Sequence, residues 1–398
     1  MDGFERSRAS GKARATLDEL AGGIGDSGLL IPIAVAMIAL NGLNATAVFV
    51  VTGLVYAGTA LYFRVPVPVQ PLKAFAAAAI ALQLSAETLA AGALLMAAAM
   101  AVLAAGGLAD WLAARFPVVL VRGIQAGVAL LLARAAVELA EQGNWPGLPP
   151  LSPAVGVTMA VACCALLFAC RRLSLPGSLL VLGAGAAVGL AVGGLPELHA
   201  GPQPLSLSIP GGNAFALALT SLVIAQLPLT FGNAVVATAD AERSYFGLRA
   251  RRVRPARLAF SIGVANACAG LSGALPLCHG SGGVTAHYKL GARTGLSTLA
   301  AGALFVALGL GLGSSLPALL EVLAPGALAG MLAYVAIQHG LLAGGLERLD
   351  DRLIAAGVGL TTLLAGNLAI GFAAGAAVVA GRAAWRRSPW ASGSLARA

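Results

Sequence analysis

Two proline-centred breaks interrupt apolar stretches of this sequence, and their residues are of the types that bind anions. The breaks are Pro66-Val67-Pro68-Val69-Gln70-Pro71-Leu72-Lys73 and Pro276-Leu277-Cys278-His279-Gly280-Ser281-Gly282-Gly283. Polar backbone inside a membrane is tolerated only where it is buried in protein or lines a wet cavity. A pair of such breaks in corresponding halves of a chain predicts the substrate site of a transporter.

The first break predicts a helix that begins inside the protein, near Pro71. Pro66 and Pro68 favour extended backbone, whereas Pro71 suits the first turn of a helix, where its missing N–H has no partner to lose. The free N–H groups and the dipole at a helix start present roughly half a positive charge. Gln70 and Lys73 flank this start with an amide and an ammonium, which is the chemistry of an anion site.

The second break predicts a helix start that a ligand can approach closely. In Gly280-Ser281-Gly282-Gly283 few side chains shield the backbone N–H groups, and Ser281 can cap the helix or donate a hydrogen bond. His279, which follows Cys278, can donate to an oxyanion or carry a proton. The alternative is a tightly packed turn in which His279 only satisfies a carbonyl, but the symmetry with the first break favours binding.

Polar residues in two other apolar spans are candidates to complete the site. Asp26, followed by Ser27, is an acid in an apolar stretch, which is costly and by default functional. Near an anion its carboxylate would be protonated, paired with Lys73, or coupled to a cation or proton; a helix-breaking role is the alternative. Thr230 and Asn233 could line a cavity or join helices. The predicted substrate-binding residues are Asp26, Ser27, Gln70, Lys73, Thr230, Asn233, Cys278, His279, Gly280, Ser281 and Gly282.

The composition places these residues in a polytopic membrane protein. Of the 398 residues 59% are hydrophobic and 10% charged, 52 are glycine, and the mean hydropathy is +0.88, which excludes an ordinary soluble domain. The formal net charge is +9, yet the connections 139–152 and 194–212 have no Lys or Arg. We attribute the clustered basic residues to topology rather than to nucleic-acid binding, with contact to anionic lipid as a secondary role of the Arg-rich stretch 243–257.

The remaining polar residues are assigned structural roles. The five cysteines show no metal-ligand spacing and are interpreted as small buried thiols, so no metal site is predicted. Asp240 and Glu242, next to Arg243, are interpreted as a solvated helix end. His199 and His339 have no companion and are assigned no role.

Hydrophobicity predicts fourteen apolar spans, several of them too short to cross a bilayer fully. The charged amino terminus lacks the apolar stretch of a cleavable signal peptide and is expected to stay in the cytoplasm. Alternation from there places the basic connections inside and makes both termini cytoplasmic. The spans lie near 22–40, 44–63, 70–85, 87–109, 117–137, 153–170, 177–194, 213–239, 255–273, 280–289, 294–313, 316–342, 351–365 and 367–383.

The two halves carry a trace of duplication. Gly25-Asp26 matches Gly232-Asn233 at an offset of 207 residues, and Pro68 matches Pro276 at an offset of 208. Because seven spans in each half is an odd number, the second half must be inserted in the opposite orientation. We therefore expect an all-α membrane protein built of seven plus seven spans as inverted repeats.

These motifs resemble those of the molybdate transporters related to the SulP sulfate permeases. The resemblance rests on the segments 66–74, 231–240 and 275–283, and on Gly291-Ala292-Arg293-Thr294-Gly295. It implies the fold shared by SulP and uracil permeases, with short strands before the third and tenth spans and a core domain that moves against a gate domain. SulP proteins usually end in a cytoplasmic STAS domain, which we do not find here, and this favours the molybdate branch.

The resemblance also implies the domain boundaries. We expect core-domain repeats at 17–115 and 213–314 and gate-domain repeats at 116–212 and 315–385. The segments 1–16 and 386–398 are expected to be cytoplasmic tails.

Together these residues and the resemblance predict a secondary active transporter that imports molybdate by an elevator-like step. The oxyanion would lie between the helix starts near Lys73 and Ser281. Since sulfate is also a tetrahedral dianion, a carrier of sulfate or another oxyanion is the near alternative. A nucleobase permease is disfavoured, because such sites usually need carboxylates and only Asp26 is at hand.

Other classes are weighed against the same residues. An enzyme is not expected, because Ser281 and His279 have no third group to orient them; a passive channel stays open. We expect no cofactor, and coupling to H⁺ or another ion is left open. The expected partners are a small inorganic oxyanion and the lipid bilayer, with no nucleic acid, and a homodimer is usual for the resembled fold. The composition suggests a multi-pass protein of a bacterial inner membrane.

Overall fold

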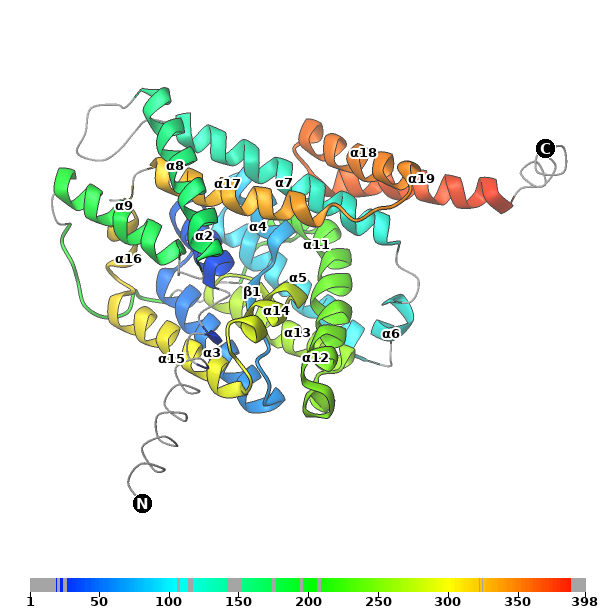
Figure 1. Cartoon of the computed structure of the whole chain (residues 1–398), viewed down its shortest axis with the longest axis horizontal. Coiled ribbons are helices and arrows are strands. Elements are labelled where there is room, and N and C mark those ends of the chain that lie inside the picture. Colours follow the sequence, from blue (N-terminus) through cyan, green and yellow to red (C-terminus); the bar gives the residue numbers. More distant parts are fainter. Residues whose placement is uncertain are drawn as a thin grey trace, which may run out of the picture.

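The computed structural model describes residues 19, 22–23, 27–105, 108–113, 117–141, 152–173, 177–193, 196–205, 209–321, 323 and 325–387, which form an almost entirely helical molecule (Figure 1). The helices of the first half are α2 (Ser27–Asn41), α3 (Ala45–Phe63), α4 (Lys73–Ala81), α5 (Ala86–Ala104), α6 (Leu108–Ala113), α7 (Val118–Glu141), α8 (Pro153–Arg172) and α9 (Gly177–Gly193). Those after residue 254 are α13 (Pro255–Ser272), α14 (Ser281–Lys289), α15 (Gly295–Leu312), α16 (Leu316–Glu321), α17 (Pro325–Leu342), α18 (Leu349–Ala365) and α19 (Leu368–Arg387).

The helical segment between these two sets runs from Gly212 to Arg252 and changes its winding, and Gly247, with φ 54° and ψ −129°, sets its last turn apart from the rest. It consists of α10 (Gly212–Ala218), η1 (Leu219–Val223), α11 (Ile224–Leu229), η2 (Thr230–Ala237), α12 (Thr238–Phe246) and η3 (Gly247–Arg252). The segments η1 and η2 are π-helical, and the Thr238 hydroxyl donates to the carbonyl of Asn233, five residues earlier, at 3.0 Å. Because π-helical turns are frequent at functional sites, η2 draws attention to the middle of this helix.

The predicted spans correspond to single helices with few exceptions. The span predicted at 316–342 is divided into α16 and α17, because Pro325 at the first position of α17 cannot continue a preceding helix. Within the described ranges seven helices are long and apolar enough to cross a membrane. They are Ala45–Phe63, Ala86–Ala104, Val118–Glu141, Pro153–Arg172, Gly212–Arg252, Gly295–Leu312 and Leu368–Trp385.

Two of the structural roles predicted for single residues are wrong. Glu242, expected at a solvated helix end, is fully buried at 0% exposure, because it lies on the face of α12 that also buries Ala239 and Phe246. Asp240 on the same helix is exposed. Cys268, expected to be a buried thiol, is exposed on the outer face of α13.

The helices pack in a pattern that is repeated between the two halves. α3 packs along α15, and α13 packs along α5. In the same way α18 packs on α7 and α19, while α8 packs on α17 and α9. When each helix is replaced by its counterpart in the other half, the α3–α15 contact becomes the α13–α5 contact, and the contacts of α18 become those of α8. This symmetry is expected of inverted repeats.

Hydrogen bonds between connections agree with the predicted alternation of sides. Arg252 donates to the carbonyl of Tyr62 at 2.8 Å and so joins the ends of the second and eighth spans. The N–H of Gly201 donates to the carbonyl of Gly311 at 2.9 Å and so joins the connection after the seventh span to the end of the eleventh. Even-numbered connections meet even ones, and odd-numbered connections meet odd ones.

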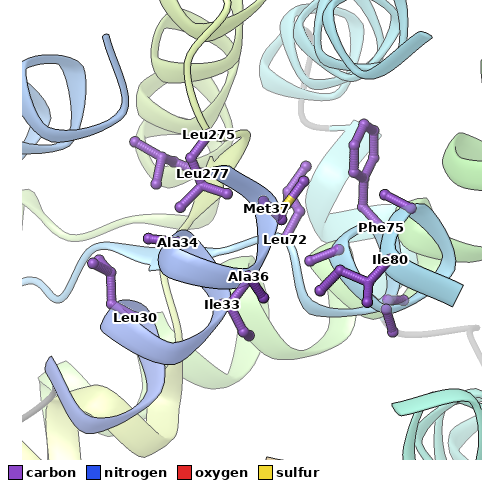
Figure 2. Close-up of a cluster of buried hydrophobic side chains, with 14 of the residues drawn as sticks. Leu30, Ile33, Ala34, Ala36, Met37, Leu72, Phe75, Ile80, Leu275 and Leu277 are labelled. Carbon is purple, nitrogen blue, oxygen red and sulfur yellow. The ribbon is translucent and has the colours of Figure 1, made fainter. Parts of the chain in front are cut away.

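The core surrounds the place where α2 lies against the two breaks (Figure 2). Ile33 and Met37 of α2 belong to one buried cluster with Leu72 and Phe75 around the start of α4, and with Leu277 of the second break. Each of these five side chains is at most 1% exposed. Since protein interiors are close-packed, a shift of either break would open a void or a clash, so this cluster holds both breaks in register with α2.

Candidate functional site

Two short antiparallel strands set the two half-helices opposite one another. β1 (Gln70–Pro71) pairs with β2 (Leu277–Cys278), with Gln70 opposite Cys278. Just beyond the strands, α4 begins at Lys73 and α14 at Ser281. Because the strands run in opposite directions, the two helices leave the pair at its two ends. The two predicted breaks, each with a strand before a half-helix, are confirmed.

The start of α4 lies among buried polar groups. Lys73 is only 8% exposed, and its ammonium takes part in no hydrogen bond or ion pair within the described residues. The N-cap residue Leu72 offers no side-chain hydrogen bond; the N–H of Phe75 donates instead to Gln226 Oε1 of α11 at 2.8 Å. The N–H groups of Lys73 and Ala74 are left as donors without a partner in the described part of the chain.

The start of α14 is open to a ligand. The Ser281 hydroxyl donates to Asn233 Oδ1 of η2 at 3.0 Å, which brings two predicted site residues together and leaves Asn233 Nδ2 as a donor. A Cβ built at Gly282 would meet no atom within 4 Å. Gly283 N–H donates to the carbonyl of Gly280 at 3.0 Å, whereas among the described residues the N–H groups of Ser281 and Gly282 have no partner.

Gln70 and Gly280 touch across the strand pair. A Cβ at residue 280 would collide with Gln70 Oε1, so glycine there makes room for the amide. Gln70 is 1% exposed and lies within reach of both helix starts. The Cys278 thiol donates to the carbonyl of Pro71 at 3.4 Å and so faces the backbone of β1.

His279 ties the first break to α13. Its Nδ1 lies 2.8 Å from the carbonyl oxygen of Pro68, and its Nε2 lies 3.1 Å from Ser261 Oγ. A neutral imidazole satisfies both neighbours when Nδ1–H donates to the carbonyl and Nε2 accepts from the hydroxyl. Both ring nitrogens are then occupied, which is the geometry of the alternative in which His279 satisfies a carbonyl.

The other predicted site residues differ in what the structure says of them. Thr230 is 1% exposed and accepts from Gln226 Nε2 at 2.7 Å, so it supports the residue that caps α4. Asp26 lies outside the described residues. Ser27 is the first residue of α2, and its side chain lies outside the description.

Three buried polar side chains that sequence reasoning did not single out hold the broken backbone in place. The Tyr56 hydroxyl donates to the carbonyl of Val69 at 3.0 Å. The Asn266 amide donates to the carbonyl of Leu277 at 2.6 Å and accepts from the N–H of the same residue at 3.2 Å. Asn41 donates to the last turn of α4. These bonds satisfy backbone groups that lipid cannot, and their one sequence signal was a polar residue in an apolar span.

His339 of α17 is a further buried group near the start of α4. It is 1% exposed, its Nδ1 lies 3.1 Å from the carbonyl oxygen of Val335, and its Nε2 has no partner. When Nδ1–H donates to that carbonyl, Nε2 is a bare acceptor. The Lys73 ammonium lies near enough for its charge to act on the imidazole. The structure thus brings to the site a histidine to which the sequence analysis assigned no role.

Comparisons with known sequences bear on what this geometry is for. The chain matches the family model described as "Molybdate transporter of MFS superfamily" over residues 18–132 and 218–339, and these segments include α4 and α14. It is similar to Molybdate transporter 2 of Arabidopsis thaliana, with 26% identity over 90% of this chain and 85% of that protein. For Molybdate transporter 1 of the same plant the values are 27%, 94% and 89%.

Comparisons with solved structures bear on the fold. The transmembrane domain of the cyanobacterial bicarbonate transporter BicA has a TM-score of 0.68 and 17% identity, over 90% of this chain and 97% of that one. The murine anion transporter Slc26a9 in its inward-facing state has a TM-score of 0.66 and 14% identity, over 93% and 68%. Although the family description names the MFS superfamily, the fold is the one found in these two transporters, in agreement with the resemblance to SulP permeases.

Proposed function

Because the chain belongs to the molybdate transporter family, we propose that it imports molybdate across a bacterial cytoplasmic membrane and holds the dianion between the starts of α4 and α14. The observation that carries the proposal is the pair of interior helix starts. Each has backbone N–H groups without a partner in the described part of the chain, and one has a buried ammonium.

The donors at these helix starts suit a dianion that can only accept hydrogen bonds. The ammonium of Lys73 and the N–H groups of Lys73 and Ala74 lie at one start. At the other are the N–H groups of Ser281 and Gly282 and the Nδ2 group of Asn233. Two helix starts of roughly half a positive charge each and one ammonium sum to about two positive charges, which balances a dianion.

The site moves, in this proposal, with a core domain formed by residues 17–115 and 213–314 against a gate domain formed by 116–212 and 315–385. α4 belongs to the core and packs on α7 of the gate. Its sequence is KAFAAAAIA, and small side chains form shallow ridges that interlock less with a neighbouring helix. Such a surface suits an elevator-like step, in which one domain slides past the other.

His339 of α17 lies on the gate side of the proposed site. Its Nε2 is a bare acceptor without a partner among the described residues, and no hydrogen bond joins it to Lys73, although the charge of Lys73 acts on the imidazole. We infer that His339 acts on the movement of the core rather than on binding of the dianion.

Uptake of isotopically labelled molybdate into liposomes that contain the purified protein tests the proposed function. We expect saturable uptake that a hundredfold excess of sulfate inhibits only weakly and that uracil does not inhibit. Equal inhibition by sulfate and unlabelled molybdate would establish a general oxyanion carrier instead. Absence of uptake under imposed proton and sodium gradients of either direction would contradict the proposal.

A further inference from the structure

A groove of about 560 Å³ lies between α3 and α13, and none of the predicted site residues lines it. Its walls are almost entirely apolar, and Arg257 is the one charged side chain among the described residues that form them. The lining residues from α3 and α5 are Val51, Leu54, Val55, Gly58, Thr59, Tyr62, Phe63 and Ala104, and those from α13 are Ala256, Arg257, Phe260, Ser261, Val264, Ala265 and Cys268.

The groove has the length and the surface of a site for one hydrocarbon chain. Its lining positions extend over 51–63 on α3 and 256–268 on α13, which at 1.5 Å per residue is about 18 Å on each wall. One leaflet of the hydrocarbon core is about 15 Å thick. The apolar side chains of Leu54, Phe260 and Val264 are 58%, 63% and 47% exposed. Such exposure is typical of side chains that contact lipid rather than water.

One end of the groove is positively charged. The Arg257 guanidinium lies over the ring of Tyr62, 5.8 Å from its centroid, and Arg252 donates to the carbonyl of Tyr62. Arg64 and Arg254 are exposed in the adjoining connections, and among the described lining residues there is no Asp or Glu. We propose that the groove binds an anionic phospholipid, with one acyl chain between α3 and α13 and the phosphate on Arg257.

Two residues that line this groove contact His279 of the second break. Ser261, whose Oγ lies 3.1 Å from His279 Nε2, lines the groove. Phe63 also lines it and meets the His279 ring edge-on, at 6.4 Å between centroids. His279 in turn holds the carbonyl of Pro68 in the first break. An acyl chain over Ser261 keeps water from this chain of hydrogen bonds, so the bound lipid stabilises the site as well as the helices.

The experiment measures lipid retention by the delipidated, purified protein with native mass spectrometry, and the melting temperature in detergent. The probes are phosphatidylglycerol and phosphatidylcholine with identical acyl chains. We expect one phosphatidylglycerol to be retained and to raise the melting temperature by several degrees more than phosphatidylcholine does. Gly58→Phe, which fills open space in the groove, should abolish retention; Arg257→Gln should remove only the preference for phosphatidylglycerol.

Matched variants keep this test specific. Gly357→Phe places the same side chain at another glycine with open space on an apolar helix, and Arg172→Gln removes an arginine elsewhere; both should behave as wild type. Val264→Trp blocks the groove from the other wall, in case Gly58→Phe fails to fold. The proposal is overturned if wild type retains both lipids equally or if a folded groove variant retains lipid like wild type. It is also overturned if the groove variants change the oligomeric state of the protein and not its lipid retention. None of these readouts depends on molybdate transport.

Discussion

Lys73 has an energetic reason to require an anion. It is 8% exposed and has no ion-pair partner among the described residues, and a buried charge is costly unless it is paired. The Nε2 acceptor of His339 does not compensate this charge, because it makes no hydrogen bond to Lys73. In the proposed function, a dianion at the two helix starts supplies the missing counter-charge, which makes the empty site the less favourable state of this residue.

Loss of the His339 imidazole should separate binding from movement. We expect His339→Gln to change the molybdate dissociation constant less than threefold, since the donors of the proposed site remain, but to slow uptake at least tenfold, since the imidazole acceptor on the gate side is lost. The measurement is calorimetric binding beside uptake into liposomes. His199→Gln, at an exposed histidine, is the control. Uptake by His339→Gln at the wild-type rate would remove His339 from the account.

The two hydrogen bonds of His279 predict a structural cost for its removal. His279→Ala leaves the carbonyl of Pro68 and the hydroxyl of Ser261 without their partner and opens a cavity, so the free energy of unfolding should fall by about 2 to 4 kcal/mol. Thermal and denaturant unfolding measure it, with His199→Ala as control. A stability equal to that of wild type, together with lost binding, would show that His279 contacts the anion directly.

Single residues were predictable where the local sequence restricts the backbone. The prolines around Gln70 and the glycines around Ser281 predict two interior helix starts, and the structure has them. The contact of Asn233 with Ser281 joins residues 48 positions apart, and only the fold creates it. Gln226 and Asn266 were missed for the same reason: a polar residue in an apolar span does not indicate which backbone atom it meets.

At the scale of elements, the start of α4 depends on a cap supplied from another helix. Gln226 Oε1 accepts from the N–H of Phe75, and its Nε2 donates to Thr230, so α4 is held against α11 without a capping residue of its own. This arrangement keeps side chains of the N-cap position out of the site. It also makes the position of α4 sensitive to the winding of α11 and η2, which carry Gln226 and Thr230.

Replacement of Gln226 should therefore act through α4. Gln226→Leu leaves the N–H of Phe75 and the hydroxyl of Thr230 without a partner. The unpaired N–H alone should lower the free energy of unfolding by about 1 to 3 kcal/mol. Gln226→Glu keeps the acceptor but adds negative charge at the anion site, so molybdate should bind at least tenfold more weakly. Calorimetry on both variants checks the pair. Equal affinities for Gln226→Glu and wild type would place the dianion elsewhere.

The elements themselves were largely predictable, and the misses have local causes. Apolar length located most helices, whereas Pro325, a helix-starting residue inside the span predicted at 316–342, divides α16 from α17. The π-helical winding of η2 has no comparable signature in the sequence: Pro228 lacks an N–H donor just before η2, and the Thr238 hydroxyl donates to the carbonyl of Asn233 within it, but neither residue type predicts π-helical turns. The burial of Glu242 follows from the packing of α12 on α14 rather than from its charged neighbours.

At the scale of the whole molecule, helices of the first half pack against helices of the second half, so the two halves form one structural unit. α3 with α15 and α13 with α5 join the proposed core repeats to each other, while α7 with α17 joins the proposed gate repeats. The proposed site lies where β1 and β2, one from each proposed core repeat, pair. The offset of about 208 residues was visible in the sequence; which helices exchange partners was not, because that depends on the folded halves.

A disulfide between core and gate should stop transport while leaving the site intact. A Cβ at Gly232 would lie 3.6 Å from Val121 Cγ2 of α7, so Gly232→Cys with Val121→Cys is within reach of a disulfide. In a background with the five native cysteines replaced by alanine, oxidation should abolish uptake, preserve binding, and be reversed by reductant. The control is Gly263→Cys with Met100→Cys, both within the proposed core, where a Cβ at Gly263 would lie 3.4 Å from Met100 Cβ. This variant should still transport when it is oxidised.

The measurement that tests the central claim most directly is calorimetric titration of molybdate into wild type, Lys73→Gln and Lys289→Gln. Lys289 lies exposed in the last turn of α14 and controls for loss of a lysine. Loss of one charge-assisted contact of about 1.5 to 3 kcal/mol should weaken binding roughly 10- to 150-fold in Lys73→Gln and leave Lys289→Gln unchanged. Wild-type affinity in a folded Lys73→Gln protein would contradict an anion site at the start of α4.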